Sequence, residues 1–532
     1  MVVGAGPAGS AAALELARAG RSVVLLERGP FPGSKNVYGG VIYPRVLDGV
    51  LPDWREDAPA QRWVVRRSTV LLSGDRAVSV DVRVPGWGRP PGNGMTAYRA
   101  DFDSWLADRA VRAGARLVAS TTATGLLRGP GGRVAGVRTD RPGGDLAARV
   151  VIACDGVNSL LAREAGLHPG PQARHTALGV KEVIALPRDA IDQRFGLSGD
   201  EGADFEMLGC TGGIPGGGFL YTNAETVAVG AVLSVSGLAS SGRRPEEVVD
   251  RIKRHPAIAP YLRGGTVKEY AAHLVPEGGY RHMPRLYGDG ILVAGDAAGM
   301  TLAAGIWLEG VNFAIGAGLA AGRAAAEALA AGDTGRRGLA RYERALRSSF
   351  VLADHARLRG APTWCSPRGC STATPASPPT WRRPRSPWTT PRPSRGWPGC
   401  CCAPPGPTGS ACTTSPPTPG GSPVSSADRP RPLPPAEEPS LADRMATVDF
   451  DVGGRPHITV DTRVCRSCTT KACVSACPAD LFSPTADGGV LFNYEHCFEC
   501  GTCYLVCNEA GAISWGYPDG GRGVVFRRGE RC

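Results

Sequence analysis

The chain has 532 residues and is 42% hydrophobic, which predicts two or more domains of a soluble globular protein. Its net charge of +11 does not indicate nucleic-acid binding, because residues 361–432 carry eight Arg and one Asp, or +7, which leaves +4 for the rest. No segment approaches the roughly 18 uninterrupted apolar residues of a membrane span. The N-terminus also lacks a secretory signal pattern, so we expect a cytoplasmic protein.

Residues 2–27 predict a dinucleotide-binding unit. They form a strand of small apolar residues, the loop Gly4-x-Gly6-x-x-Gly9, a helix, and a second strand that ends at Glu27. In such units the glycines allow a tight turn, an approach of the backbone to pyrophosphate, and close packing of helix on strand. The pyrophosphate binds at the helix N-terminus, and an acid in the position of Glu27 holds a ribose hydroxyl. A purely structural glycine loop explains neither the acid nor the flanking strands.

The loop that follows contains Arg28 and Lys35 and ends in Gly39-Gly40, where the backbone can come close to a flat ring system. An ordinary surface loop is the alternative. Arg99 stands at the start of a predicted helix whose apolar residues recur at helical spacing. The sequence leaves open whether Arg99 faces a phosphate or solvent.

Two apolar strands end in short motifs of the kind that contact a bound cofactor. One leads to Asp155-Gly156, and the other leads to Gly295-Asp296, whose carboxylate we expect beside sugar or ribityl hydroxyls. A plain exit from strand to turn is the alternative for each.

A helix rich in small residues is predicted over residues 311–329, with Gly305 in the segment before it and Asn312 in its first turn. Its N-terminus offers a second site for pyrophosphate. Charged and polar residues interrupt it, so we do not expect it to span a membrane. They are Glu309, Asn312, Arg323 and Glu327.

Between these motifs, residues 116–120 and 133–139 predict a two-stranded segment. From about residue 177 to 270 the pattern changes to shorter strands, with one helix over 245–255, which indicates a sheet inserted into the nucleotide fold. Residues 341–358 predict a further helix.

Residues 361–432 differ from the rest of the chain. They hold 19 of the 46 Pro, four of the ten Trp and six Cys, and no Leu, Ile, Phe, Tyr or Met, so they cannot bury a core. They are either a Pro-rich linker or a segment translated out of frame. If the reading frame is shifted over residues 363–381, the codons can encode an amino-acid sequence with ordinary apolar periodicity. We therefore favour a frameshift that joins two genes, and we assign none of these six Cys as ligands.

Two four-cysteine runs follow near the C-terminus: Cys465-x2-Cys468-x4-Cys473-x3-Cys477-Pro478 and Cys497-x2-Cys500-x2-Cys503-x3-Cys507. Thiolates grouped this closely suit [4Fe–4S] clusters, with the fourth Cys of each run serving the other cluster. Zinc is the alternative, since paired C-x2-C motifs also bind zinc. The first run has x4 where x2 is usual, so the sequence predicts one cluster and leaves the second open.

With these motifs, the chain resembles the electron-transfer flavoprotein–quinone oxidoreductase family, in particular its bacterial Fix-type flavoprotein, over about residues 2–360. Further matching phrases are GSKNVYGG at 33–40, ALGVKEVIALP at 177–187, GGGFLYTN at 216–223 and EGVNFAI at 309–315. The C-terminal part is similar to the small Fix ferredoxin-like partner, through CPAD at 477–480, CFECGTC at 497–503 and WGYPDGGRGVVFRRG at 515–529.

The resemblance implies a Rossmann-like α/β FAD-binding domain over residues 1–360, with an α+β sheet inserted at about 171–285. A Pro-rich linker over 361–439 and a ferredoxin-like iron–sulfur domain over 440–532 would follow. In the related single-chain enzymes the cluster ligands match Cys477, Cys497, Cys500 and Cys503. Two features depart from the family: four additional Cys (465, 468, 473 and 507) suggest a second cluster, and the last flavoprotein helices are absent or scrambled after residue 361.

The function implied by the resemblance is electron transfer from a reduced electron-transfer flavoprotein, a Fix-type α/β heterodimer, to a quinone at the inner face of the cell membrane. Fix systems of this kind are linked to flavin-based bifurcation, whose bifurcating flavin would lie in the partner. No side chain need act as acid or base in this transfer, and the sequence nominates none.

Two other functions stay open. A flavin monooxygenase or prenyl reductase shares the glycine-loop, DG and GD motifs, although the ferredoxin-like tail disfavours it. The chain can also be a damaged fusion, in which only the tail folds and acts as an electron carrier.

Overall fold

The computed structural model describes residues 1–37, 40–90, 92–361, 439–507 and 511–527. These residues, on both sides of the gap after 361, fall in one compact unit. The predicted Pro-rich segment and its six Cys lie outside the described residues, so the linker and frameshift hypotheses both stay predictions.

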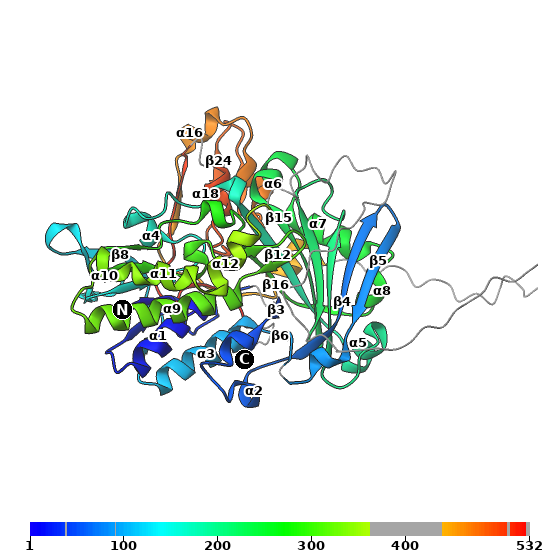
Figure 1. Cartoon of the computed structure of the whole chain (residues 1–532). Helices are drawn as coiled ribbons and strands as arrows, with labels where there is room; N and C mark the ends of the chain where they lie inside the picture. Colours follow the sequence, from blue (N-terminus) through cyan, green and yellow to red (C-terminus); the bar gives the residue numbers. More distant parts are fainter. Residues whose placement is uncertain (38–39, 91, 362–438, 508–510, 528–532) are drawn as a thin grey trace, which may run out of the picture. The chain divides into compact units, whose positions relative to one another are not determined.

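A six-stranded sheet carries the dinucleotide-binding motifs (Figure 1). Its order is β17-β18-β11-β1-β2-β7, and all neighbours are parallel except β17 and β18. The strands are β1 (Val2–Val3), β2 (Val24–Leu26), β7 (Arg116–Val118), β11 (Val151–Ala153), β17 (Tyr287–Gly288) and β18 (Ile291–Val293). Ligands of such sheets bind at the carboxyl ends of the strands. The glycine loop, Asp155 and Asp296 all follow strands at that edge.

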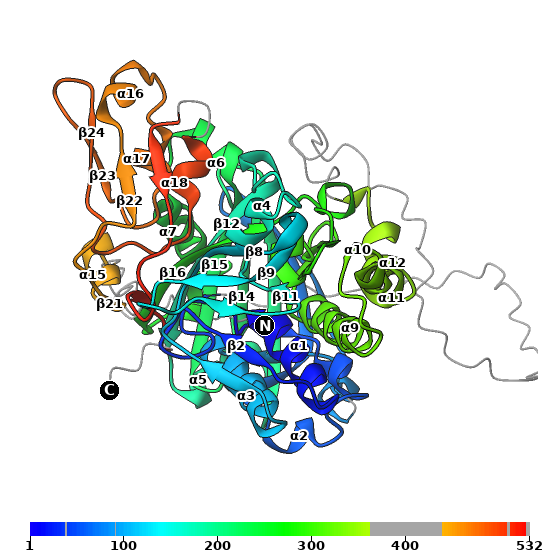
Figure 2. The same ribbon diagram turned by 90° about the vertical axis from the view of Figure 1, so that its left-hand side faces the viewer.

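Three helices pack beside this sheet: α1 (Pro7–Arg18), α3 (Arg99–Arg112) and α9 (Val311–Ala330) (Figure 2). Glycine allows α1 and α9 to approach closely, because a Cβ on Gly318 would lie 2.1 Å from the carbonyl oxygen of Ala8. Among the described residues, α9 alone is long and apolar enough to cross a membrane. Of its most apolar window 67% is buried inside the protein, as in the core helix of a soluble domain.

The inserted domain is built on a large mixed sheet, in the order β16-β12-β15-β14-β13-β4-β6-β3, with β5 paired to β4. Residues 176–276 contribute β12 (Thr176–Ala185), β13 (Glu201–Leu208), β14 (Gly216–Thr222), β15 (Thr226–Ser234) and β16 (Thr266–Pro276). Helix α7 (Pro245–Arg254) packs on β12 and β15. The sheet also takes strands from earlier in the chain, which the sequence analysis did not anticipate: β3 (Gly40–Ile42), β4 (Arg62–Ser73), β5 (Arg76–Arg83) and β6 (Met95–Ala97).

Two local predictions were wrong. Residues 116–120 and 133–139 do not pair: β7 extends the parallel sheet, whereas β9 (Val134–Thr139) pairs with β8 (Ala123–Arg128) and β10 (Leu146–Ala147). The helix predicted over 341–358 is two helices, α11 (Arg341–Arg347) and α12 (Phe350–Arg357). The break occurs because the Ser349 hydroxyl caps α12, accepting a hydrogen bond from the amide of Val351.

The C-terminal part consists of short elements around the cysteine runs. It contains three two-stranded ladders, in which β21 (Asp449–Asp451) pairs with β26 (Gly523–Val525), β22 (Ile458–Val460) with β25 (Ile513–Trp515), and β23 (Phe482–Pro484) with β24 (Val490–Phe492). The helices of this part are α15 (Leu441–Met445), α16 (Thr462–Ser467), α17 (Ala472–Ala476) and α18 (Thr502–Val506). Its apolar side chains join those of the inserted sheet in one hydrophobic core, for example where Tyr270 packs edge-to-face on Phe498.

Candidate functional site

The three loop glycines have distinct surroundings. Gly4 has a φ of +94°, and a Cβ there would lie 2.3 Å from the carbonyl oxygen of Cys154. A Cβ on Gly9 would lie 1.8 Å from the carbonyl oxygen of Gly4, so Gly9 allows α1 to pack on the loop. A Cβ on Gly6 would meet only the side chains of Arg99 and Asp103, each at 3.9 Å, which is an ordinary van der Waals contact. The open side of Gly6 at the N-terminus of α1 therefore fits an approaching pyrophosphate.

Glu27 is held in place by backbone amides at the end of β2. Its buried carboxylate accepts hydrogen bonds from the N–H groups of Ala5 at 3.0 Å and Gly29 at 2.7 Å. Burial raises the pKa of Glu27 above its ordinary value, although both amide donors oppose the shift. The carboxylate borders the cavity beside the glycine loop, where a ribose hydroxyl would reach it.

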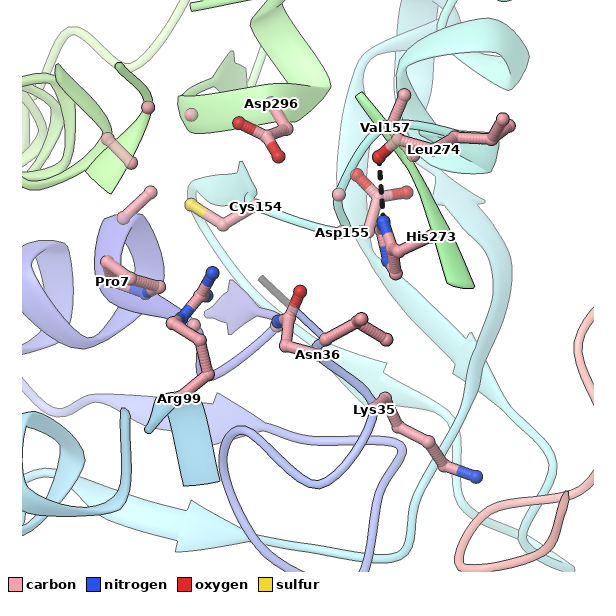
Figure 3. Close-up of a pocket in the computed structure, with 18 of the residues that line it drawn as sticks. Pro7, Lys35, Asn36, Arg99, Cys154, Asp155, Val157, His273, Leu274 and Asp296 are labelled. Atoms are coloured by element: carbon pink, nitrogen blue, oxygen red, sulfur yellow. Dashed lines mark hydrogen bonds between the residues drawn. The ribbon is translucent and has the colours of Figure 1, made fainter. Parts of the chain in front are cut away.

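That cavity, of about 180 Å³, gathers most of the predicted flavin-binding residues (Figure 3). They are Gly4, Gly6, Glu27, Arg28, Lys35, Arg99, Asp155, Gly156, Gly295 and Asp296. Arg99 borders it with its guanidinium engaged by Asp103, through two hydrogen bonds of 2.8 Å each. The Arg99 side chain is 10% exposed and borders the cavity, so its assignment to the flavin stays a prediction.

The other predicted flavin residues lie elsewhere. Gly40 and Gly305 border a second cavity, and Gly39 lies outside the described residues. Asn312 donates a hydrogen bond of 3.2 Å to Glu309, and the first cavity does not include it. The flavin assignment of all these residues stays a prediction.

Sequence reasoning missed several residues of the first cavity. Lys181, on β12, is buried and donates to the carbonyl of Val37 at 2.6 Å, and burial lowers its pKa. Tyr517 comes from the cysteine-rich tail, and the Arg28 guanidinium lies 4.1 Å from its ring centroid. Both residues stand in phrases that carried the resemblance, GVKEVI and WGYPDGG, and that was the only available signal.

A second cavity, of about 1,020 Å³, adjoins the first across Phe219 and Leu308, which border both. Charged side chains lie in its wall: Arg67 on β4 donates to Asp204 on β13 at 2.7 Å and lies 3.6 Å from Glu206. Apolar and aromatic residues, such as Trp307, form much of the remainder. The composition suits a largely apolar ligand with a polar end.

The eight tail cysteines divide between two further cavities. One, of about 280 Å³, is bordered by Cys465, Cys468, Cys473 and Cys507. The other, of about 20 Å³, is bordered by Cys477, Cys497, Cys500 and Cys503. Each run thus gives its fourth Cys to the other set, as in ferredoxins with two clusters. All eight thiols are free of disulfides, so the donor set fits two [4Fe–4S] clusters.

The tail is joined to the first cavity by buried polar contacts. Glu499, between two cluster cysteines, forms ion pairs with Arg28 and, at 2.9 Å, with Lys35. Asn158, two residues after Gly156, donates to the carbonyl of Cys500 at 3.2 Å and accepts from the Tyr504 hydroxyl at 2.9 Å. One side chain therefore connects the Asp155-Gly156 wall of the first cavity to a cluster-ligand position.

Comparison with known proteins identifies the families to which the two parts of the chain are similar. The family described as FAD dependent oxidoreductase matches residues 1–168, and the family described as 4Fe-4S dicluster domain matches residues 464–513. "Protein FixC" of Azorhizobium caulinodans is 42% identical over 368 residues, which cover 68% of this chain and 83% of that protein. The chain belongs to the FixC family. FixC of Rhizobium meliloti is 41% identical over 369 residues, with the same two coverages.

A further relative of this FixC-family chain is "Probable electron transfer flavoprotein-quinone oxidoreductase YdiS" of Escherichia coli K12, 39% identical over 364 residues, with coverages of 68% and 84%. Among solved structures, the geranylgeranyl bacteriochlorophyll reductase-like protein of Thermoplasma acidophilum superposes with a TM-score of 0.56 at 23% identity, covering 68% of this chain and 86% of that one. That likeness shows the fold.

These matches confirm the resemblance and the fold class. The chain is an FAD-dependent oxidoreductase of the FixC family with a [4Fe–4S] dicluster domain. The dicluster match decides against zinc. Among the described residues no group of His, Cys, Asp or Glu is arranged around a single metal ion.

Proposed function

We propose that the chain transfers electrons from a reduced electron-transfer flavoprotein to a quinone, with the quinone head in the second cavity. The observation that carries the proposal is continuity: Tyr517 of the tail borders the first cavity, and Phe219 and Leu308 separate that cavity from the second. YdiS, whose name states this activity, supports it.

The chain's own side chains position the cofactors. A bound flavin accepts one or two electrons and a bound cluster passes one at a time. Glu27 and the open side of Gly6 hold the dinucleotide end, while Asp155 and Asp296 border the same cavity. Asn158 holds the Cys500 segment beside the chain that follows Gly156, so one hydrogen-bonded side chain links the two cofactor sites.

The test uses the full chain, purified anaerobically, with FAD and iron measured in the same 55.3 kDa species. A reduced electron-transfer flavoprotein is the donor and a soluble ubiquinone analogue is the acceptor. We expect quinol formation at the rate of donor oxidation. A fully loaded protein that forms no quinol would refute the proposal. Oxygen consumption with NAD(P)H would favour the monooxygenase alternative, and a product with iron but no flavin would favour the damaged fusion.

We further propose that this transfer is one branch of a Fix-type bifurcating complex on the cytoplasmic face of the membrane. Membership of the FixC family supports the first part. Exposed apolar side chains on the β4–β5 hairpin support the second: Leu71, Val78, Val80 and Val82 are 45–66% exposed. If the chain works in bifurcation, quinol formation in the assembled complex will be accompanied by reduction of a low-potential ferredoxin.

A further inference from the structure

The second cavity contains a buried carboxyl group that the electron-transfer proposal does not use. Asp204 and Glu206 are two residues apart on β13, so both side chains point to the same side of the sheet. Glu206 is 9% exposed and borders the cavity. Its Oε2 is buried and has no hydrogen-bond partner. A buried polar atom without a hydrogen-bond partner destabilises the folded protein, so it calls for an explanation.

Arg67, the nearest cation, does not satisfy both acids. It hydrogen-bonds Asp204 at 2.7 Å, whereas its distance to Glu206 Oε1 is 3.6 Å, beyond a good hydrogen bond. One guanidinium charge thus faces two carboxyl groups, and two adjacent buried acids cannot both ionise easily.

The charged and titratable groups near Glu206 come from several elements. In register, the uncharged residues Thr69 of β4 and Phe219 of β14 lie opposite it. Tyr43 and the carboxyl of Glu309 interact with Arg67 across the cavity. The described wall of the cavity also holds the basic residues Arg174, His175, Arg243, Arg281, His282 and Arg359. Burial, and then the charge of Asp204, raise the pKa of Glu206 to about 9 against the opposing charge of Arg67, and a hydrogen bond with Asp204 adds to the rise, so this acid carries its proton at neutral pH.

We propose that Glu206 is the proton donor to the quinone in the second cavity, with Arg67 and Asp204 positioning it. The inference rests on the proposed function. Reduction of a quinone to a quinol takes two electrons and two protons. A bound, reduced flavin would supply the two electrons. The O–H bond of Glu206 breaks as one quinone oxygen gains its hydrogen, and solvent supplies the second proton and reprotonates Glu206. Arg67 stabilises the carboxylate formed in between.

The test compares Glu206→Gln with wild type and with Glu201→Gln, a control on the same strand whose carboxylate pairs with Arg83 outside the cavity. We expect quinol formation by wild type to be constant at neutral pH and to fall above about pH 9, as the donor loses its proton. Glu206→Gln should form quinol about 10²-fold more slowly and lack that decline, while its flavin is reduced at the wild-type rate. Glu201→Gln should match wild type.

Infrared spectroscopy gives a readout that needs no turnover. Wild type at pH 7 should show a protonated-carboxyl band that shifts when a quinone analogue binds and that Glu206→Gln lacks. If wild type forms quinol and Glu206→Gln keeps its rate and pH profile, the inference is wrong and the proposed function stands. If loaded wild type forms no quinol, both fail.

Discussion

Gly6 differs from Gly4 and Gly9 because a Cβ there would meet its nearest protein atoms, on Arg99 and Asp103, only at 3.9 Å. An alanine there adds a methyl group where the pyrophosphate must lie and displaces no protein atom. We therefore predict that the free energy of unfolding of Gly6→Ala lies within about 1 kcal/mol of the wild-type value. We also predict that this variant is purified with little or no FAD. Gly9→Ala is the contrast: its Cβ would meet the Gly4 carbonyl at 1.8 Å, so the fold itself should be destabilised. Thermal unfolding and the flavin absorbance distinguish the two defects, and full flavin in a stable Gly6→Ala protein would contradict the assignment.

For single residues, a role could be predicted from the sequence when the residues that share it lie close together in the chain. Gly4, Gly6 and Glu27 were predictable because their roles follow from spacing within one βαβ unit. Tyr517 and Glu206 were not, because what makes them notable is a partner hundreds of residues away or a cavity formed by several strands. A local sequence pattern does not predict contacts between residues that lie so far apart in the chain.

Among the structural elements, the tail segment around Glu499 is held by charge. Burial alone would raise the pKa of Glu499, but Arg28 and Lys35 outweigh it, and the pKa lies below its ordinary value. A carboxylate with a lowered pKa stabilises the folded protein above its unfolded pKa of about 4.3, and this contribution is lost as the pH falls through the folded pKa. We predict that wild type loses stability, and then FAD, as the pH drops below about 4.3.

Glu499→Gln should already lack this stabilisation at neutral pH, at a cost of about 3–5 kcal/mol, and should show a weaker dependence on acid. Glu495→Gln, on the exposed surface of the same segment, is the control. Thermal unfolding between pH 7 and about pH 3, a range set to bracket the carboxyl pKa, checks both. Equal acid sensitivity in wild type and Glu499→Gln would argue against the ion pairs.

We also predict that the β4–β5 hairpin contributes to binding at the membrane surface. Val78 and Val80 are 66% and 64% exposed, so replacing both with Ser should reduce binding to liposomes of bacterial lipids without loss of stability. Val111→Ser on α3, where Val111 is 38% exposed, is the matched control. Flotation of the three proteins with liposomes measures the effect, and equal flotation would place the membrane contact elsewhere.

Helices and strands were predictable where the local pattern was strong. The structure has strands within residues 177–270 and helix α7 at Pro245–Arg254, as the pattern indicated, and it has α9 within a residue of its predicted end. Strand pairing was harder, since β4 pairs in parallel with β13, which lies far along the chain at Glu201–Leu208. Alternation within a strand identifies its buried face and leaves its neighbour unspecified.

For the whole molecule, the two cysteine cavities predict the metal content. The intact chain should hold about eight irons in two [4Fe–4S] clusters. Cys468→Ser should remove the cluster of Cys465, Cys468, Cys473 and Cys507, whereas Cys477→Ser should remove the other, each leaving about four irons. Iron analysis with electron paramagnetic resonance of the reduced proteins checks this. Four irons in wild type, unchanged by Cys468→Ser, would leave the larger cavity without a cluster.

The single hydrophobic core shared by the inserted sheet and the tail bears on how the two parts persist in a cell. If they are translated from separate reading frames, neither has a finished surface until it meets the other, because Tyr270 and Phe498 would each face water. Chains with such exposed apolar surface are continuously removed by proteases. The scarcer half would then set the abundance of both, and turnover alone would hold flavoprotein and ferredoxin at equal numbers.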